Sequence, residues 1–304
     1  MTMVNGAVAR SAVDSRVLSG LKMASNATGV DFSYLLAQAS MESSLKPKAE
    51  AATSSATGLF QFIDQTWLQT FREHGGKYGQ AALANQIEVN ANGRASVRDP
   101  VLRQQILDLR KDPTLASALG AELARDNGDV IETALGREAG PTELYLAHFL
   151  GAGGATSFLA ALGANRSETA ANLFPEAAAA NRSIFYDASG HARSLGEVYD
   201  GFAGRMAREI RRFTDLPMPA GVETASAWST SFTCGPAAHA TGSAAGGGMI
   251  EAMRALTRTG TTILSPTLVA TLAALPVPGS KDDPSTLLAR RMAGLDASQR
   301  SDDL

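Results

Sequence analysis

The chain has little of what marks disulfide-rich, metal-binding or nucleic-acid-binding proteins. Its single cysteine, Cys234, can form no internal disulfide and has no companion at the spacing of a metal site. The 27 Lys and Arg against 30 Asp and Glu leave a net charge of −3, without the basic excess of proteins that bind nucleic acid or anionic membranes. We therefore expect a fold held by packing alone, with no nucleic acid among its partners.

Long hydrophobic runs are also absent. The N-terminal "MTMVNGAVARSAVDSRVLSGL" interrupts its apolar residues with Asn, Arg, Ser and Asp before a run of about 7 apolar residues appears, which is unlike a secretory signal peptide. The window "TTILSPTLVATLAAL" is broken by Ser265 and Pro266 and falls short of the roughly 18 apolar residues of a spanning helix. The sequence predicts no signal peptide and no transmembrane segment.

The alternating β-branched pattern of strands is scarce, whereas apolar residues recur at helical spacing. With 44% hydrophobic residues over a length of 304, the chain can bury a sizeable core, and we predict an all-α, mainly helical body. Asp31, Pro141 and "SLGE", residues 194–197, are signals for helix starts. Helices are expected at about residues 8–25, 31–44, 64–74, 99–111, 114–127, 130–136, 141–150, 155–163, 168–180 and 194–213.

The composition changes after Phe213. Seven of the 12 prolines follow residue 214, in a segment that mixes Pro, Gly, Ser and Ala without a period. Such a segment has little apolar surface to offset the entropy of ordering it. We expect residues 1–213 to form one domain and residues 214–304 to be a linker and largely disordered tail, with short helices near 248–257 and 284–293.

Glu42 stands in an unusual place for an acid. In the helix expected there, Leu35, Ala39 and Glu42 share one apolar stripe, so the carboxylate points toward the core. It also lies in the last turn, where the helix dipole disfavours negative charge. Both effects favour the uncharged carboxyl that a general acid needs near neutral pH. The plainer alternative is an acid at the rim of the core, paired with Lys46 or Lys48.

A turn rich in Ser, Thr and Gly follows this acid. "TSSATGLFQF", residues 53–62, supplies the hydroxyls of Ser54 and Ser55, a glycine that permits close backbone approach, and the amide of Gln61. An amide suits sugar hydroxyls and acetamido groups, although a lone Gln is usually a plain surface residue. Trp67, in the next expected helix, is predicted to be a core residue rather than a platform for a sugar.

The stretch "ESSLKPKAEAATSSATGLFQF", followed by "TW", resembles the signature of the soluble lytic transglycosylase domain, a member of the lysozyme-like superfamily. The matching positions are Glu42, Ser43, Pro47, Ala49, residues 54–58, Leu59 and Gln61. "ELYLAHFLGAGGA", residues 143–155, is similar to the glycine-rich motif with a tyrosine across the family's groove, as in phage-type and alphaproteobacterial members. "LFPEAAAANRSIFYDASGHARSLGEVY" resembles the end of the same domain. The resemblance covers about residues 20–212.

This resemblance implies a peptidoglycan lytic transglycosylase with a lysozyme-like fold and no metal or organic cofactor. In the family, one glutamate protonates the oxygen between N-acetylmuramic acid (MurNAc) and N-acetylglucosamine (GlcNAc). It then takes the proton of the muramoyl C6 hydroxyl, which closes a 1,6-anhydro ring. Glu42 holds the position of this catalytic residue, and no second carboxylate is needed. Substrate contacts are expected from Ser54, Ser55, Gln61, Tyr145 and His148.

The second block departs from the Tyr-Asn-Ala-Gly pattern that is common in the family. Two alignments result, with either Tyr145 or Phe149 as the groove aromatic. Tyr145 is preferred, because on a helix begun by Pro141 it lies one turn before His148, so both side chains can face the groove. The alternative is a buried Tyr and His pair that packs the helix.

Two other functions stay open. A hydrolytic muramidase would release a reducing sugar by water attack and would need a second carboxylate from Asp64, Glu73 or Glu88. A glycan-binding component of a secretion or flagellar apparatus would not need an acid at Glu42. Peptidoglycan as the substrate places the protein in the periplasm or at the cell wall. We then expect export by a flagellar or other specialised secretion apparatus, or delivery with a phage.

Overall fold

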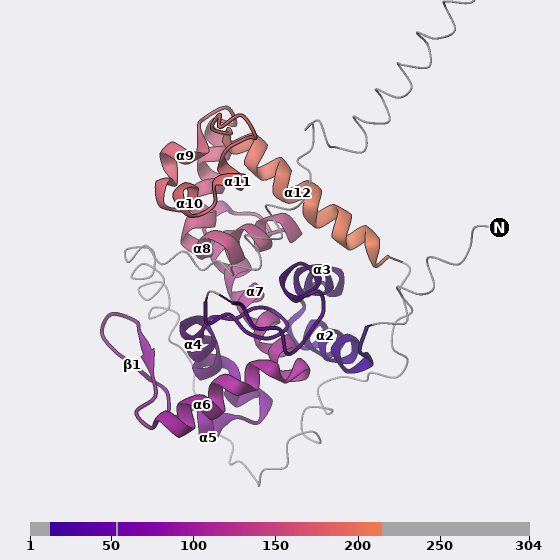
Figure 1. Ribbon diagram of the computed structural model, residues 1–304, viewed down its shortest axis with the longest axis vertical. Helices are drawn as coiled ribbons and strands as arrows, with labels where there is room; N and C mark the ends of the chain where they lie inside the picture. The colour runs from indigo at the N-terminus through magenta and orange to yellow at the C-terminus, as the bar shows by residue number, and fades with distance from the viewer. Residues whose placement is uncertain (1–12, 53, 215–304) are drawn as a thin grey trace, which may run out of the picture.

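The computed structural model describes residues 13–52 and 54–214, and this part of the chain is mainly α-helical, as predicted (Figure 1). The helices are α2 (Ser15–Thr28), α3 (Phe32–Ser43), α4 (Asp64–His74), α5 (Ala81–Ala84), α6 (Pro100–Asp108), α7 (Pro113–Leu135), α8 (Pro141–Ala164), α9 (Ala170–Leu173), α10 (Pro175–Ala180), α11 (Arg182–Phe185) and α12 (Leu195–Arg212). Two 3₁₀ turns, η1 (Gly75–Tyr78) and η2 (Leu109–Lys111), follow α4 and α6.

The predicted helix-start signals are confirmed. The Asp31 carboxylate accepts a hydrogen bond from the backbone N–H of Tyr34 at 2.9 Å at the start of α3. Ser194 and Glu197 form a capping box at the start of α12, and Pro141 occupies the first turn of α8. These local interactions satisfy backbone N–H groups that no helical partner can reach.

Several element boundaries differ from the prediction. Predicted helices 114–127 and 130–136 form the single α7, because Gly128 does not interrupt it. Predicted helices 141–150 and 155–163 form α8, in which Gly151 alone has a non-helical φ of 74°. The predicted helix 168–180 instead divides into α9 and α10, since Pro175 starts a new helix.

The structure also differs from the prediction at a small hairpin and at the start of the chain. Strand β1 (Glu88–Val89) pairs with β2 (Ala95–Ser96) in antiparallel register, and strands this short leave no alternating pattern in the sequence. Helix α2 begins after its cap Asp14 and continues past the predicted end at residue 25 to Thr28. Residues 8–12 of the predicted first helix lie outside the described residues, as do the predicted helices near 248–257 and 284–293.

Helix α7 lies at the centre of the described chain and packs against α2 and α8, while α12 packs against α8 and α3. Figure 1 shows the short helices α9, α10 and α11 gathered at the top, with the hairpin strand β1 at the left edge, lower down and nearer α4 and α6. One cluster of buried apolar residues runs from Val17 to Met206. Trp67 is fully buried in it, as predicted, and donates a hydrogen bond to the Ile106 carbonyl at 2.8 Å.

Helix α8 is the most apolar long helix in the described part of the chain. Among the described residues, it is the one helix long and apolar enough to cross a membrane by length and composition. Its side chains Tyr145, Phe149 and Phe158 are fully buried in the core. A helix buried within a domain meets the same test, because it is apolar on most of its faces.

Candidate functional site

Glu42 occupies the last turn of α3 and is completely buried. The helix ends just after it, because Ser44 and Leu45 adopt the left-handed φ values 53° and 61°. Their backbone N–H groups donate to the carbonyls of Ser40 and Ala39 at 2.8 and 3.3 Å. A side chain in this conformation costs about 1–2 kcal/mol relative to the ordinary regions. Strained backbone therefore lies directly beside the buried acid.

The carboxylate of Glu42 has an unusual environment. Within the described part of the chain, neither of its oxygens has a hydrogen-bond partner. The Nε2 atom of His148, on α8, lies 3.1 Å from Oε1, which is an ion-pair distance without the alignment of a hydrogen bond. Lys46 and Lys48, the partners of the plainer interpretation, are exposed at the surface. A buried carboxylate left without hydrogen bonds is rare, because burying it carries a high free-energy penalty.

Two tyrosines lie close enough to Glu42 for its charge to act on their hydroxyls. Burial raises the pKa of Tyr145 and of Tyr34, and the negative charge of Glu42 raises both pKa values further. Both phenols therefore stay protonated and can donate hydrogen bonds. Among the described residues, the Tyr145 hydroxyl has no hydrogen-bond partner. Its ring stacks on His148 with a centroid distance of 6.0 Å, so the two share one face of α8.

The structure distinguishes between Tyr145 and Phe149, the two aromatic residues that the sequence left as alternatives. Phe149 is fully buried among other rings, with centroid distances of 5.0 Å to Phe202 and 6.4 Å to Phe185. Tyr145 also contacts Phe202, edge-on with a centroid distance of 5.7 Å. Its hydroxyl, however, lies close enough to Glu42 for the carboxylate charge to raise the pKa of Tyr145. Tyr145 is thus the one of the two that lies beside the acid.

Gln61 helps to build the loop that follows the acid. It is buried, with a φ of 50°, and its Nε2 atom donates to the Gly58 carbonyl at 2.9 Å and to a second backbone carbonyl at 3.2 Å. The loop is fastened to α3 where Ser43 Oγ donates to the Leu59 carbonyl at 2.8 Å. The amide nitrogen of Gln61 therefore shapes the loop next to Glu42.

Ser54 and Ser55 lie at the exposed edge of this loop. Ser54 Oγ accepts from the backbone N–H of Ala56, and Ser55 Oγ accepts from that of Asp64, each at 3.2 Å. Neither hydroxyl hydrogen-bonds to Glu42. The structure brings Tyr145 and His148 to the acid, whereas the two serines stabilise turns at the surface.

Three residues near the site, Tyr34, Gln38 and Arg205, were not predicted as site residues. Tyr34, Gln38 and Glu42 follow each other at four-residue spacing on α3, and the Oε1 atom of the buried Gln38 has no hydrogen-bond partner in the described chain. This spacing was visible in the sequence. Arg205 on α12 interacts electrostatically with Tyr145, and burial lowers its pKa to about 10. No local pattern marks Arg205, because α12 follows α8 only after three intervening helices.

Two of the three carboxylates considered for a hydrolytic mechanism, Asp64 and Glu88, form ion pairs with arginines. Asp64 forms ion pairs with Arg103 at 2.6 Å and with Arg110 at 2.9 Å. Glu88 forms an ion pair with Arg98 at 3.0 Å. Each of these acids is thus neutralised by arginine. This arrangement suits fixed structural anions better than a proton-transfer group.

Glu73, His74 and Asp126 are the one group among the described residues whose ligand atoms, all within 4.8 Å of one another, could hold a metal ion. However, His74 Nε2 already lies 2.6 Å from Asp126 Oδ2, and Arg125 forms ion pairs with both Asp126 and Glu122. A metal would have to displace this hydrogen bond and compete with the arginine. We assign His74 and Asp126 to a buried ion network between α4 and α7, whereas Glu73 is exposed at its edge.

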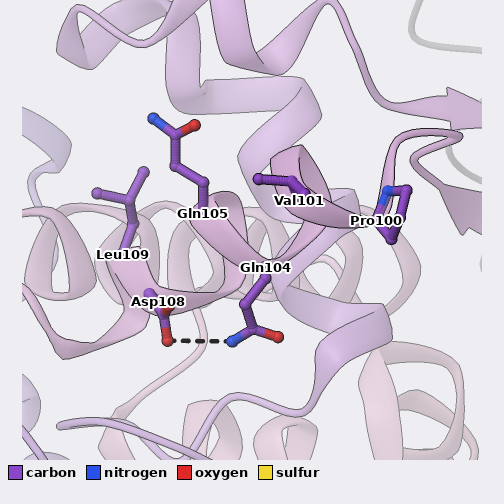
Figure 2. A pocket seen from close by; sticks show the side chains of 6 residues that line it. All are labelled: Pro100, Val101, Gln104, Gln105, Asp108 and Leu109. Carbon is purple, nitrogen blue, oxygen red and sulfur yellow. Dashed lines mark hydrogen bonds between the residues drawn. The ribbon is translucent and has the colours of Figure 1, made fainter.

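An open hollow of about 790 Å³ lies on the surface of α6, away from these residues. Figure 2 shows its lining, with the hydrogen bond between Gln104 and Asp108 on the helix surface. Its lining residues are Pro100, Val101, Gln104, Gln105, Asp108 and Leu109. None of them belongs to the group around Glu42.

No family model matches the chain. The site is therefore defined by its own geometry. A buried carboxyl can give and take a proton, an imidazole lies 3.1 Å from it, and a protonated phenol is available as a donor. Together Glu42, His148 and Tyr145 bring together the kinds of group that acid–base chemistry uses.

Proposed function

We propose that the protein is a peptidoglycan lytic transglycosylase with a lysozyme-like fold. It cleaves the β-1,4 bond between MurNAc and GlcNAc and leaves 1,6-anhydro-MurNAc ends. The observation that carries the proposal is the fully buried Glu42, whose oxygens have no hydrogen-bond partner in the described chain, beside His148 and Tyr145. The resemblance of the sequence around Glu42 and Gln61 to the lytic transglycosylase signature supports it.

In the proposed reaction Glu42 acts twice. As a carboxylic acid it protonates the bridging oxygen, the bond from that oxygen to C1 of MurNAc breaks, and the GlcNAc side leaves as an alcohol. The resulting carboxylate then accepts the proton of the C6 hydroxyl, whose oxygen bonds to C1. Glu42 is thereby regenerated as an acid, and no water is consumed. A positioned acid–base group of this kind accelerates a reaction by roughly 10² to 10⁴.

The neighbours of Glu42 have distinct roles in this mechanism. Tyr145, which stays protonated, donates a hydrogen bond to the carboxylate that forms after the first proton transfer or to the leaving sugar. His148, whose side chain is 13% exposed and lies 3.1 Å from Glu42, contacts the substrate in this mechanism.

The proposed substrate fixes where the protein works. Peptidoglycan lies outside the cytoplasm, so the proposal includes action in the periplasm or at the cell wall. It also includes export by a flagellar or other specialised secretion apparatus, or delivery with a phage. Of the predicted C-terminal segment, residues 214–304, all but Thr214 lie outside the described residues.

The variant Glu42→Gln tests the proposal. It keeps the shape of the side chain but removes the acidic proton of the carboxyl. Solubilisation of purified sacculi should therefore fall at least about 10²-fold. Glu132→Gln, at an exposed position on α7, is the matched control and should retain full activity. Thermal unfolding of both variants checks that they are folded. Sacculus cleavage by folded Glu42→Gln at the rate of the wild type would contradict the proposal.

A further inference from the structure

Arg110 lies in the 3₁₀ turn η2 and is only 7% exposed, although an arginine at a helix end is normally solvated. Its Nη1 atom donates to the carbonyls of Ser55 at 2.8 Å and Phe62 at 3.0 Å and lies 2.9 Å from Asp64 Oδ1. Its Nε atom donates to the Leu107 carbonyl at 2.8 Å. One guanidinium therefore joins α6 to the segment before α4.

These contacts enclose the loop of the candidate site. Ser55 and Phe62 bracket residues 55–62, which we call the 55–62 loop, and one nitrogen of Arg110 holds the carbonyls at both of its ends. The main chain of Arg110 contacts the middle of the same loop. A Cβ added at Gly58 would lie 2.1 Å from the Arg110 carbonyl oxygen. Arg110 thus contacts the loop at its ends and at its centre.

The loop is in turn joined to the acid. Gln61 closes it by donating to the Gly58 carbonyl, and Ser43, the residue after Glu42, donates to the Leu59 carbonyl at 2.8 Å. A continuous series of hydrogen bonds therefore leads from Arg110 through the loop to the end of α3. The position of the loop relative to Glu42 is fixed by these bonds.

Packing alone does not explain the arginine. Burial lowers the pKa of Arg110, and the charge of Asp64 offsets this only in part. An apolar side chain would fill the same space without that desolvation penalty. What a guanidinium adds is a rigid set of donors that fixes the positions of carbonyl oxygens.

We propose that Arg110 is a positioning residue, which sets the 55–62 loop at the correct distance from Glu42 for the glycan. It acts through the loop, without touching the substrate. The inference rests on the proposed function for its effect on turnover, whereas its effect on the loop is independent of any activity.

The test compares Arg110→Lys with Arg103→Lys in the full-length protein. Lysine keeps the charge at either position, but at Arg110 its single Nζ atom cannot replace both Nη1, which holds the two ends of the loop, and Nε, which donates to the Leu107 carbonyl and orients the guanidinium. Arg103 contacts only the other oxygen of Asp64 in this region and is 40% exposed, so it is the matched control. Amide hydrogen exchange and sacculus kinetics are measured for both variants.

For Arg110→Lys, exchange should accelerate in residues 55–62 but not in α7, and kcat/KM should fall roughly tenfold, the effect of losing one charged hydrogen bond. Arg103→Lys should match the wild type within about twofold. Unchanged exchange in the loop would overturn the inference. A general loss of protection with wild-type kinetics in the folded fraction would also overturn it, because Arg110 would then be purely structural.

If Arg110→Lys does not fold, Asp64→Asn removes the anion that neutralises Arg110 and should loosen the same loop; unaltered loop exchange in that variant would overturn the inference. If the wild type does not cleave peptidoglycan, the proposed function fails. The exchange comparison then still decides whether Arg110 holds the loop.

Discussion

Gly58 provides a sharp test of how the loop is held against η2. Its φ of 86° lies in the left-handed region, and an added Cβ would meet the Arg110 carbonyl oxygen at 2.1 Å. An alanine in this conformation costs about 1–2 kcal/mol, of which about 0.4–1 kcal/mol is regained because alanine restricts the unfolded chain. Relieving the overlap requires backbone movement, at about 1–3 kcal/mol. Gly58→Ala should therefore lower the free energy of unfolding by about 1.5–4 kcal/mol.

The matched control is Gly29→Ala at the end of α2. Gly29 has nearly the same φ, 80°, but no atom lies within 4 Å of the position of its added Cβ. Gly29→Ala should therefore show only the cost of placing alanine at a positive φ, which is a fall in Tm of about 1–4 °C. Gly58→Ala should lower the Tm by about 3–16 °C, because the overlap with Arg110 adds to that cost. Thermal unfolding followed by circular dichroism measures both. Equal shifts in the two variants would refute the close contact between the loop and Arg110.

Three further predictions address the end of α3, the phenol beside the acid and the buried ion network. Ser44→Gly should raise the Tm by about 1–4 °C, because glycine adopts the φ of 53° without strain; a lower Tm in calorimetry would contradict this. Tyr145→Phe should reduce sacculus turnover about tenfold with little change in Tm, and unchanged turnover would leave the ring a packing role only. Burial alone raises the pKa of Asp126, but the hydrogen bond and charge of His74, together with Arg125, lower it below its ordinary value. Since the unfolded chain then takes up the proton first, this stabilisation is present above about pH 4 and is lost as the pH falls further. Urea unfolding should show a smaller loss of stability in acid for Asp126→Asn, and an identical pH dependence would contradict the assignment.

The features that the sequence predicted depend on local spacing. The caps at Asp31 and Ser194 satisfy nearby N–H groups, so the residues themselves mark the helix starts. The burial of Glu42 follows from its place on the stripe with Leu35 and Ala39, which the structure confirms. Local rules suffice where both partners of an interaction lie within one or two helical turns.

Other features depend on contacts between distant segments. The approach of His148 to Glu42 requires α8 to pack beside α3, which no local pattern encodes. Arg110 occurs at the end of a predicted helix, where an arginine is ordinarily exposed, and its burial depends on carbonyls of the 55–62 loop. Gly128 and the two-residue strands β1 and β2 were misjudged, because tertiary packing overrides weak local preferences.

Mass analysis of the products distinguishes a lytic transglycosylase from a hydrolase. Purified sacculi are digested with the full-length protein, and the released muropeptides are weighed. The proposed reaction yields 1,6-anhydro-MurNAc ends, which are lighter by one water than reducing ends and should be nearly absent with Glu42→Gln. Products with reducing ends only would identify a hydrolase. Equal release of anhydro products by Glu42→Gln would show that another residue transfers the proton.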